Sequence, residues 1–423
     1  MEKDYSKLIE QWNIAGENYA TEINEMLLFV DNHGWENWKK EEAEDKRGNL
    51  SDGVLNLLKK ANETKTVDQF RADFPPAHIP FAHLLQEKGQ AISQLTVIDS
   101  QKILLMVGAL WENPQCYLVE NDVVTKMDAN IIAIGKSKKN DIFAYAYTDK
   151  VVLKKSWDGA IIATFYTDML AKKDNRITEL IPFNSGEEVL LVTSGGIYVL
   201  SQDKTQLIHP NDDEFLTEDK YGYAYDYIDM ENATLSHDNN YIVTGHQDGP
   251  HIVFDKTGVQ IGTIGQQSEY PHYCLFLKDD SQLITNSCHF YNGMTIGVST
   301  DKLEGIEIEP YTESDEYTII DESMRVYAAV SSTDYYILGD AYGYIQAVDK
   351  NGKFLWRHYL GSTISGMALS TDEKTLWIGT HAGILHKLEL GIGHRDTHTI
   401  GNGHHYETFR LLFWKNEENI LKW

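Results

Sequence analysis

The stretch ISGMALSTDEKTLWIGTHAGILHKLEL, residues 364 to 390, decides the fold. Its apolar residues fall into three short runs, separated by a polar turn at residues 371 to 374 and a second turn at residues 381 to 383. Short apolar runs bounded by turn residues are typical of antiparallel strands with tight connections. In the third run Ile384 and Leu388 share one parity, so we predict a half-buried strand there.

The same unit recurs earlier in the chain. Residues 235 to 245, LSHDNNYIVTG, align without a gap on residues 369 to 379, LSTDEKTLWIG. Each copy reaches a second glycine four positions after the first, and Gly339 and Gly343 mark a third copy. Four-strand units repeated about every 40 to 45 residues are typical of the blades of a β-propeller.

Seven such units can be marked along the chain. They cover residues 95–127, 131–165, 177–209, 228–264, 273–309, 317–360 and 364–400. Two remnants are left, because residues 407–423 resemble the first two strands of a blade and residues 81–94 resemble the last two. We therefore predict a mainly β fold, a β-propeller of eight four-stranded blades closed by pairing of the N- and C-terminal strands. Seven blades with an irregular tail are the alternative.

The first 75 residues differ in kind from the rest. Tyr19, Ile23 and Val30 follow helical spacing, as do Val54 and Leu58. Prolines at the end of this region disfavour continuation of a helix. We predict a small N-terminal helical region over residues 1–75 and the propeller over residues 76–423.

Residues 347 to 356, AVDKNGKFLW, carry a more specific pattern. It resembles the Ala-x-Asp-x-x-Gly-x-x-x-Trp repeat of quinoprotein-type propellers, and the chain from about residue 80 onward resembles bacterial WD-repeat and quinoprotein-like propellers. The Gly-His and Trp-Asp pairs of the WD-repeat consensus are missing at the expected positions. The resemblance implies that Asp349 bonds turn amides, that Gly352 takes a positive φ and that Trp356 packs between blades. It implies an architecture and no activity.

Charge bounds the possible partners. The formal net charge of −27 argues against binding to the phosphate backbone of nucleic acids and favours a basic protein as partner, with solubility alone as the other interpretation. The chain opens with no apolar export segment and has no apolar run long enough to span a membrane. We expect a cytoplasmic protein without membrane contact. The three cysteines are far apart and imply no disulfide framework.

Two long connections combine carboxylates with tyrosines, at residues 211–229 and 307–322. Tyrosine gives a large contact area at low entropic cost, and carboxylates attract a basic partner. We expect both connections to lead from one blade to the next and to project from one face. The alternative is that both are simply solvated. The predicted partner-binding residues are Asp212, Asp213, Glu214, Tyr221, Tyr223, Tyr225, Tyr227, Tyr311, Glu313, Asp315, Glu316 and Tyr342.

The stretch at residues 391 to 405, GIGHRDTHTIGNGHH, is rich in histidine. His394, His398, His404 and His405 are weak candidates for a metal site, because no cysteine or convergent carboxylate completes one. We predict no metal and no cofactor. Sequence signatures of hydrolases, metalloproteases, phosphate-binding loops and dinucleotide-binding folds are missing, so we predict no catalytic residues.

These observations favour a non-catalytic, protein-binding propeller that uses an acidic, tyrosine-rich face. The most specific expectation is an immunity or antitoxin protein that neutralises a basic toxin, its cognate partner. A general protein-interaction scaffold is one alternative. A quinone- or metal-dependent enzyme, whose active site takes residues from several blades, is the other.

Overall fold

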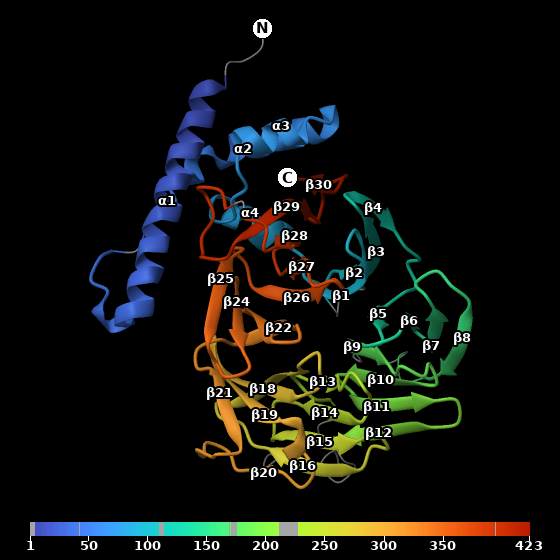
Figure 1. The fold of residues 1–423 in the computed structure, drawn as a ribbon. Helices are drawn as coiled ribbons and strands as arrows, with labels where there is room; N and C mark the ends of the chain where they lie inside the picture. Colours follow the sequence, from blue (N-terminus) through green and yellow to red (C-terminus); the bar gives the residue numbers. More distant parts are fainter. Residues whose placement is uncertain are drawn as a thin grey trace, which may run out of the picture.

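The computed structural model describes residues 5–41, 43–109, 114–168, 170, 176–210, 227–393 and 395–423. Within these residues, seven antiparallel sheets stand around a common axis, which is the architecture of a β-propeller (Figure 1). Each sheet is one blade of four or five strands. The predicted propeller is therefore confirmed, but the predicted eight blades are wrong and the alternative of seven is right.

The four regular strands of each blade follow one another along the chain. The first blade has β1 (Ile92–Asp99), β2 (Lys102–Val107), β3 (Gln115–Glu120) and β4 (Val123–Lys126). The second has β5 (Ala133–Lys136), β6 (Ile142–Tyr147), β7 (Lys150–Lys155) and β8 (Ile161–Tyr166). The third has β9 (Ile177–Pro182), β10 (Glu188–Thr193), β11 (Gly196–Ser201) and β12 (Thr205–His209). The fourth has β13 (Asn232–Leu235), β14 (Tyr241–Gly245), β15 (His251–Asp255) and β16 (Gln260–Ile264).

The remaining blades complete the ring. The fifth has β17 (Tyr270–Phe276), β18 (Gln282–His289), β19 (Asn292–Ser299) and β21 (Tyr317–Asp321). The sixth has β22 (Val326–Ser331), β23 (Tyr335–Asp340), β24 (Tyr344–Asp349) and β25 (Phe354–Tyr359). The seventh has β26 (Ile364–Leu369), β27 (Thr375–Thr380), β28 (Ile384–Leu390) and β29 (His405–Leu412). A fifth strand extends two blades, as β20 (Glu307–Ile308) pairs parallel with β16 and β30 (Leu421–Lys422) pairs with β29.

Neither of the two segments predicted to form the eighth blade does so. Residues 81–94, predicted as two strands, form the helix α4 (Ala82–Lys88) and the beginning of β1. Residues 407–423 do not begin a new blade, because β29 pairs with β28 as the fourth strand of the seventh, with Leu411 opposite Leu385. The glycine-rich stretch predicted to hold that fourth strand is the connection between β28 and β29. Trp377 of β27 packs edge-on against Phe409 of β29, and the burial of these two aromatic rings stabilises the pairing of β29 with β28.

The predicted pairing of N- and C-terminal strands is also wrong. Among the described strands, β1 to β4 form one sheet and β26 to β30 another, with no strand shared. The ring closes instead by packing the faces of the first and seventh blades together. Ile103 and Val119 of the first blade share a fully buried cluster with Trp377 and Leu385 of the seventh. Apolar burial between whole faces thus replaces strand pairing as the closure.

The repeated sequence unit corresponds to a repeated turn. In the fourth blade the Ser236 hydroxyl donates to Asp238 and accepts the amide of Tyr241, at 2.7 and 3.0 Å. In the seventh blade Ser370 donates to Asp372 and accepts the amide of Thr375, at 2.6 and 2.9 Å. The two segments align in sequence because they form the same side-chain-bonded turn.

A second turn explains the Asp-x-x-Gly pattern. Asp349 Oδ1 accepts the amides of Asn351 and Lys353, at 2.8 and 2.9 Å. Gly352 has φ of +79°, a conformation that an L side chain rarely adopts. Trp356 is half-buried and stacks edge-on against His405 of the next blade, with ring centroids 4.1 Å apart. The roles predicted for Asp349, Gly352 and Trp356 are confirmed.

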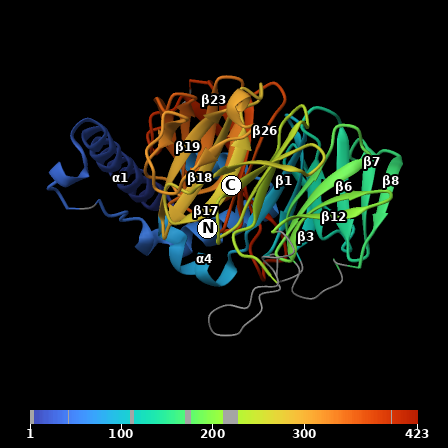
Figure 2. The same ribbon diagram turned by 90° about the horizontal axis from the view of Figure 1, so that it is seen from below.

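Chain direction divides the ring into two faces, seen edge-on in Figure 2. One face, here the 2–3 face, carries the connections from second to third strands and those from blade to blade. The opposite face, here the 1–2 face, carries the turns from first to second and from third to fourth strands. This follows from the antiparallel order of every blade.

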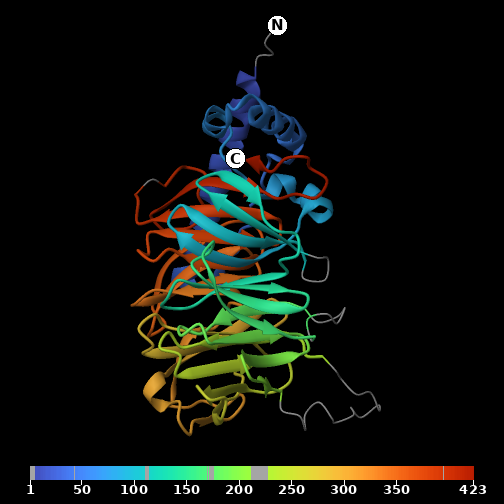
Figure 3. The ribbon, with the colours of Figure 1, turned by 90° about the vertical axis from the view of Figure 1, so that its right-hand side faces the viewer.

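The N-terminal helices lie outside the ring, beside the seventh blade (Figures 1 and 3). They are α1 (Ser6–His33), α2 (Ser51–Thr64), α3 (Val67–Asp73) and α4 (Ala82–Lys88). In α1 the buried residues recur every three or four positions and form one stripe: Trp12, Gly16, Ala20, Ile23, Leu27 and Val30. This stripe faces the propeller.

An aromatic core joins the helices to the end of the chain. Trp12 is fully buried, with its ring centroid 6.3 Å from that of Trp423. The Trp12 indole donates to Pro75 O at 3.0 Å, and the Trp423 indole donates to Phe74 O at 2.9 Å. Both indoles therefore bury their rings while keeping their N–H groups bonded.

We predict that Trp12→Ala lowers the free energy of unfolding by about 3 to 5 kcal/mol, because it leaves a cavity in this core. The matched control is Trp35→Ala, since the Trp35 side chain is 61% exposed and its loss should cost less than about 0.5 kcal/mol. Urea denaturation followed by circular dichroism measures both. Equal effects of the two substitutions would contradict the burial of Trp12 against Trp423.

Candidate functional site

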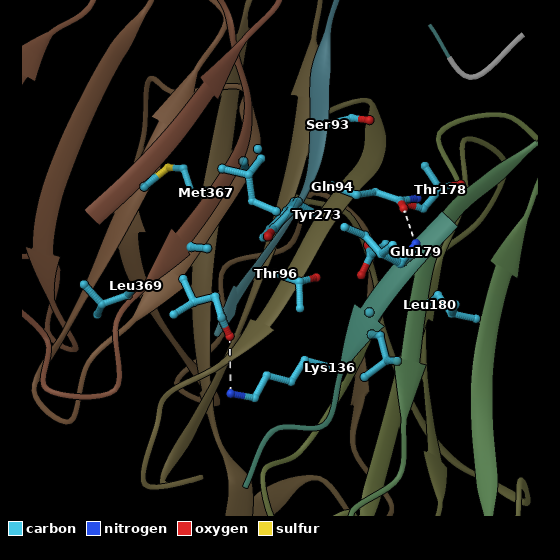
Figure 4. Close-up of a pocket in the computed structure, with 18 of the residues that line it drawn as sticks. Ser93, Gln94, Thr96, Lys136, Thr178, Glu179, Leu180, Tyr273, Met367 and Leu369 are labelled. Carbon is cyan, nitrogen blue, oxygen red and sulfur yellow. Dashed lines mark hydrogen bonds between the residues drawn. The ribbon is translucent and has the colours of Figure 1, made fainter. Parts of the chain in front are cut away.

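A cavity of about 590 Å³ lies on the axis of the ring (Figure 4). Its wall takes residues from the first strand of every blade, namely β1, β5, β9, β13, β17, β22 and β26. It reaches from His381 in a connection of the 2–3 face to Thr371 in a turn of the 1–2 face. The volume lies within the range of about 300 to 1,000 Å³ that is usual for small-molecule sites.

Close contact between blades shapes this wall. A Cβ atom added at Gly135 of β5 would stand 1.6 Å from the carbonyl oxygen of Leu180 in β9. Only glycine lets the two strands approach so closely. Gln94 of β1 fastens the same corner, because its amide donates to Ile177 O and Thr178 O, both at 3.1 Å, while its oxygen accepts the Ile134 amide at 2.9 Å. One side chain thus links three blades.

Most charged groups along the cavity have partners in the wall. Lys136 pairs with Asp141 at 2.9 Å and donates to Val97 O at 3.3 Å. Lys278 pairs with Glu373 across the 1–2 end. The Glu231 carboxylate accepts a hydrogen bond from Thr178 Oγ1 at 2.6 Å. These groups satisfy one another without a ligand.

Lys138 and Glu179 are different. Both line the cavity, from the second and third blades, and each is half-exposed to the enclosed space. Burial raises the pKa of Glu179 to about 7, against the opposing influence of Lys138 and of a hydrogen bond from the Ala233 amide. Burial lowers the pKa of Lys138, although Glu179 acts to raise it. The two groups interact electrostatically, but no ion pair within 4.0 Å joins them.

The 2–3 face carries exposed aromatic side chains beside the cavity mouth. Phe290, Tyr291 and Tyr342 are 75%, 61% and 54% exposed. They come from the 2–3 connections of the fifth and sixth blades, and the rings of Tyr291 and Tyr342 are 5.8 Å apart. We call these three residues the aromatic patch.

Arg325 connects the aromatic patch to the cavity. Its guanidinium donates to Phe290 O at 2.6 Å and to His272 Nε2 at 3.2 Å, and it lies over the Tyr327 ring at 4.8 Å. His272 and Tyr327 line the cavity, and His272 Nδ1 donates to Val326 O at 2.6 Å. The patch and the cavity mouth therefore form one continuous surface over the fifth and sixth blades.

The predicted partner-binding residues are scattered by comparison. Tyr342 belongs to the aromatic patch, and Tyr227, 49% exposed, lies in the connection to β13 on the same face. Another six predicted residues lie outside the described part of the chain: Asp212, Asp213, Glu214, Tyr221, Tyr223 and Tyr225.

The second predicted connection has a different course. Residues 307–322 do not lead to the next blade, because they contain β20 and then β21, the fourth strand of the fifth blade. The amide of Tyr311 donates to Gln266 O at 3.0 Å, which places this exposed residue at the rim of the 2–3 face. Glu313, Asp315 and Glu316 are exposed as well. Asp315 O lies 3.5 Å from Lys302 Nζ, next to the 1–2 end of β19, so this segment crosses the outer edge of the ring.

The candidate metal ligands do not converge. His394 lies outside the described residues. His398 contacts Asn13 of α1 at 3.3 Å, His404 is exposed, and His405 is buried, where its Nδ1 accepts the Gly391 amide at 3.3 Å. Among the described residues no three His, Cys, Asp or Glu side chains are placed to hold a metal ion.

The chain matches no known protein-family model, and no characterised protein is detectably similar to it in sequence. Within the part of the chain that the structure describes, no helix is long and apolar enough to cross a membrane.

Sequence reasoning missed the cavity. Lys138 and Glu179 stand about one repeat apart, and nothing local marks either as a site residue. The only signal is positional, because both belong to the innermost part of their blades. Folding the repeats into a ring, and then listing polar residues of the first strands and of the turns that follow them, would have found both.

We predict that acid destabilises the protein through buried histidines. Burial, followed by the nearby Arg325 charge, lowers the pKa of His272 to about 4. An unfolded histidine titrates near about 6.5, so between these values the unfolded state binds more protons and stability falls as pH falls. Above pH about 6.5 this contribution is complete.

Replacing His272 with Gln should flatten that dependence by up to about 1.4 kcal/mol per pH unit between pH about 6.5 and 4. Denaturation midpoints measured across this range test it. His289→Gln, at an exposed histidine of the same face, is the matched control and should leave the slope as in the wild type. An unchanged slope in His272→Gln would mean that His272 is not buried neutral.

Proposed function

We propose that this chain is a non-catalytic, protein-binding propeller and that its partner is a basic protein. The binding surface is the 2–3 face, centred on the aromatic patch. Nucleic acid and membrane are not partners under this proposal, since a chain with a net charge of −27 repels phosphate.

The exposure of the patch is the observation that supports this proposal most. Three large aromatic side chains stand more than half exposed on one face, and the rings of two of them, Tyr291 and Tyr342, lie 5.8 Å apart. Contiguous exposed apolar groups cost solvation free energy, and aromatic residues of this kind are enriched at the centre of protein interfaces. The hydrogen bond from Arg325 to Phe290 O holds the connection that presents them.

Charge on the same face supports a basic partner. Asp229, Asp248, Glu269 and Glu322 are exposed in connections of the 2–3 face around the patch. A negative rim speeds the encounter with a positive partner and leaves the aromatic centre to supply affinity.

The specific form of the proposal is an immunity or antitoxin protein that neutralises a cognate basic toxin in the cytoplasm. Membership of the WD-repeat and quinoprotein-like propellers belongs to the same proposal, and the Asp-x-x-Gly turn at Asp349 supports it. The formal charge and the aromatic patch support a basic protein as partner. The polypeptide encoded next to this one would identify that partner.

We predict that the triple variant Phe290→Ala, Tyr291→Ala, Tyr342→Ala weakens partner binding at least about 30-fold, because one hot-spot aromatic residue among the three already contributes about 2 kcal/mol. Immobilised wild type and variant would be compared for proteins retained from the native cell, followed by titration with the purified partner. The matched control is Tyr166→Ala, whose side chain is 76% exposed on the outer strand of the second blade.

The expected result is a basic protein retained by the wild type and the control but lost by the triple variant, with affinity that falls as salt rises. A partner that binds all three equally would place the interface elsewhere. A retained acidic protein would contradict the partner class.

A further inference from the structure

Lys138 and Glu179 are a cation and an anion that line the axial cavity and have no ion-pair partner among the described residues. Lys138 comes from the turn after β5, and Glu179 from the middle of β9. Within the part of the chain that the structure describes, neither takes part in an ion pair within 4.0 Å, whereas Lys136 and Lys278, which line the same cavity, are both paired. Glu179 does accept a hydrogen bond from the Ala233 amide. Of the three lysines in the lining, Lys138 is therefore the one without an ion pair among the described residues, and Glu179 is the carboxylate that acts most strongly on its pKa.

Such an arrangement is costly in a folded protein. An enclosed charge loses hydration, and a partner must restore the lost interaction or the charge is suppressed. The shifted pKa values of Glu179 and Lys138 show the same tendency toward neutral forms. A direct Lys–Glu contact would relieve both groups, yet no ion pair within 4.0 Å joins them. Groups kept separate in this way are suited to a molecule placed between them.

The rest of the lining is compatible with an organic ligand. Apolar residues from several blades also line the cavity, including Leu95, Val97, Leu180 and Met367, although Val97 and Leu180 are buried in the clusters between blades. Thr96 and Ser93 add hydroxyl groups, and the Ser93 Oγ is buried without a hydrogen-bond partner in the described protein. Figure 4 shows Thr96, Glu179 and Met367 on different sides of the same space. Mostly apolar walls with a few convergent polar groups are characteristic of ligand sites.

We propose that the axial cavity binds a small zwitterion of the amino-acid or short-peptide class, with its carboxylate toward Lys138 and its ammonium toward Glu179. The apolar lining takes the side chain. This site is independent of the partner-binding function proposed for the 2–3 face, because it uses none of the patch residues.

The first test uses matched probes on the wild-type protein. L-leucine and the dipeptide alanyl-leucine carry both charges, N-acetyl-leucine lacks the ammonium, and leucinamide lacks the carboxylate. Isothermal titration should show that one of the zwitterions binds, with the corresponding capped compounds at least about tenfold weaker. Binding of a capped compound as tightly as its zwitterion would overturn the proposal, as would no binding of either zwitterion at about 10 mM.

The second test assigns each charge. In Lys138→Met, leucine and leucinamide should bind equally, because the group that reads the carboxylate is gone. In Glu179→Gln, leucine and N-acetyl-leucine should bind equally. Lys139→Met, an exposed lysine next to Lys138 and outside the cavity lining, is the matched control and should behave as the wild type.

Thermal unfolding of the variants keeps the result interpretable. Each substitution removes a desolvated charge that has no ion pair among the described residues, so neither should lower the unfolding temperature. Zwitterion binding unchanged in both variants would show an adventitious additive only and would overturn the assignment. If a variant failed to fold, the wild-type probe series would still decide the matter.

Discussion

The structure depends on apolar packing between the faces of neighbouring blades. Backbone hydrogen bonds also join some neighbours, as where β20 pairs with β16, but the described strands of the first and seventh blades share no sheet. At the seam, Trp377 and Leu385 of the last blade bury against Ile103 and Val119 of the first. This contact joins segments far apart in the chain and must offset the entropy of closing a very long loop. The axial cavity and both faces exist only because the first and seventh blades pack together and close the ring.

Closure by packing also explains the position of the helices. A ring without a shared strand leaves the outer part of the seventh blade uncovered, where Trp414 and Trp423 are buried by helical residues such as Trp12 and Leu58. The helices thus cover an apolar surface that strand pairing would not have left. A polar network reinforces the junction, since Glu407 receives Arg410 at 2.7 Å and Arg71 at 3.3 Å. These cations lower the pKa of Glu407 well below its ordinary value although burial opposes them.

The sequence contains the local structure but not the closure. The Ser236 and Ser370 turns, and the Asp349 turn, follow from side-chain chemistry within five residues and could be predicted. Blade number could not, because the short apolar run at α4 satisfies either a helix or a strand. The number of blades depends on whether β29 pairs with β28 across the glycine-rich connection between them. The candidate site also depends on long-range structure. Lys138 and Glu179 line the same cavity only once the repeats are arranged around the axis.

The junction between the two ends of the chain bears on how the protein folds. Phe74 O receives the indole of Trp423, a hydrogen bond between residues 349 positions apart. During synthesis, helices α1 to α3 emerge first but lack the surface that buries them until the last blade is made. Their apolar stripe stays open to solvent, or to a chaperone, while the blades form in order. The contacts between the helices and the last blade join residues that are far apart in the chain, so helix docking is a late event. The helical region should therefore be the last part to gain protection from hydrogen exchange.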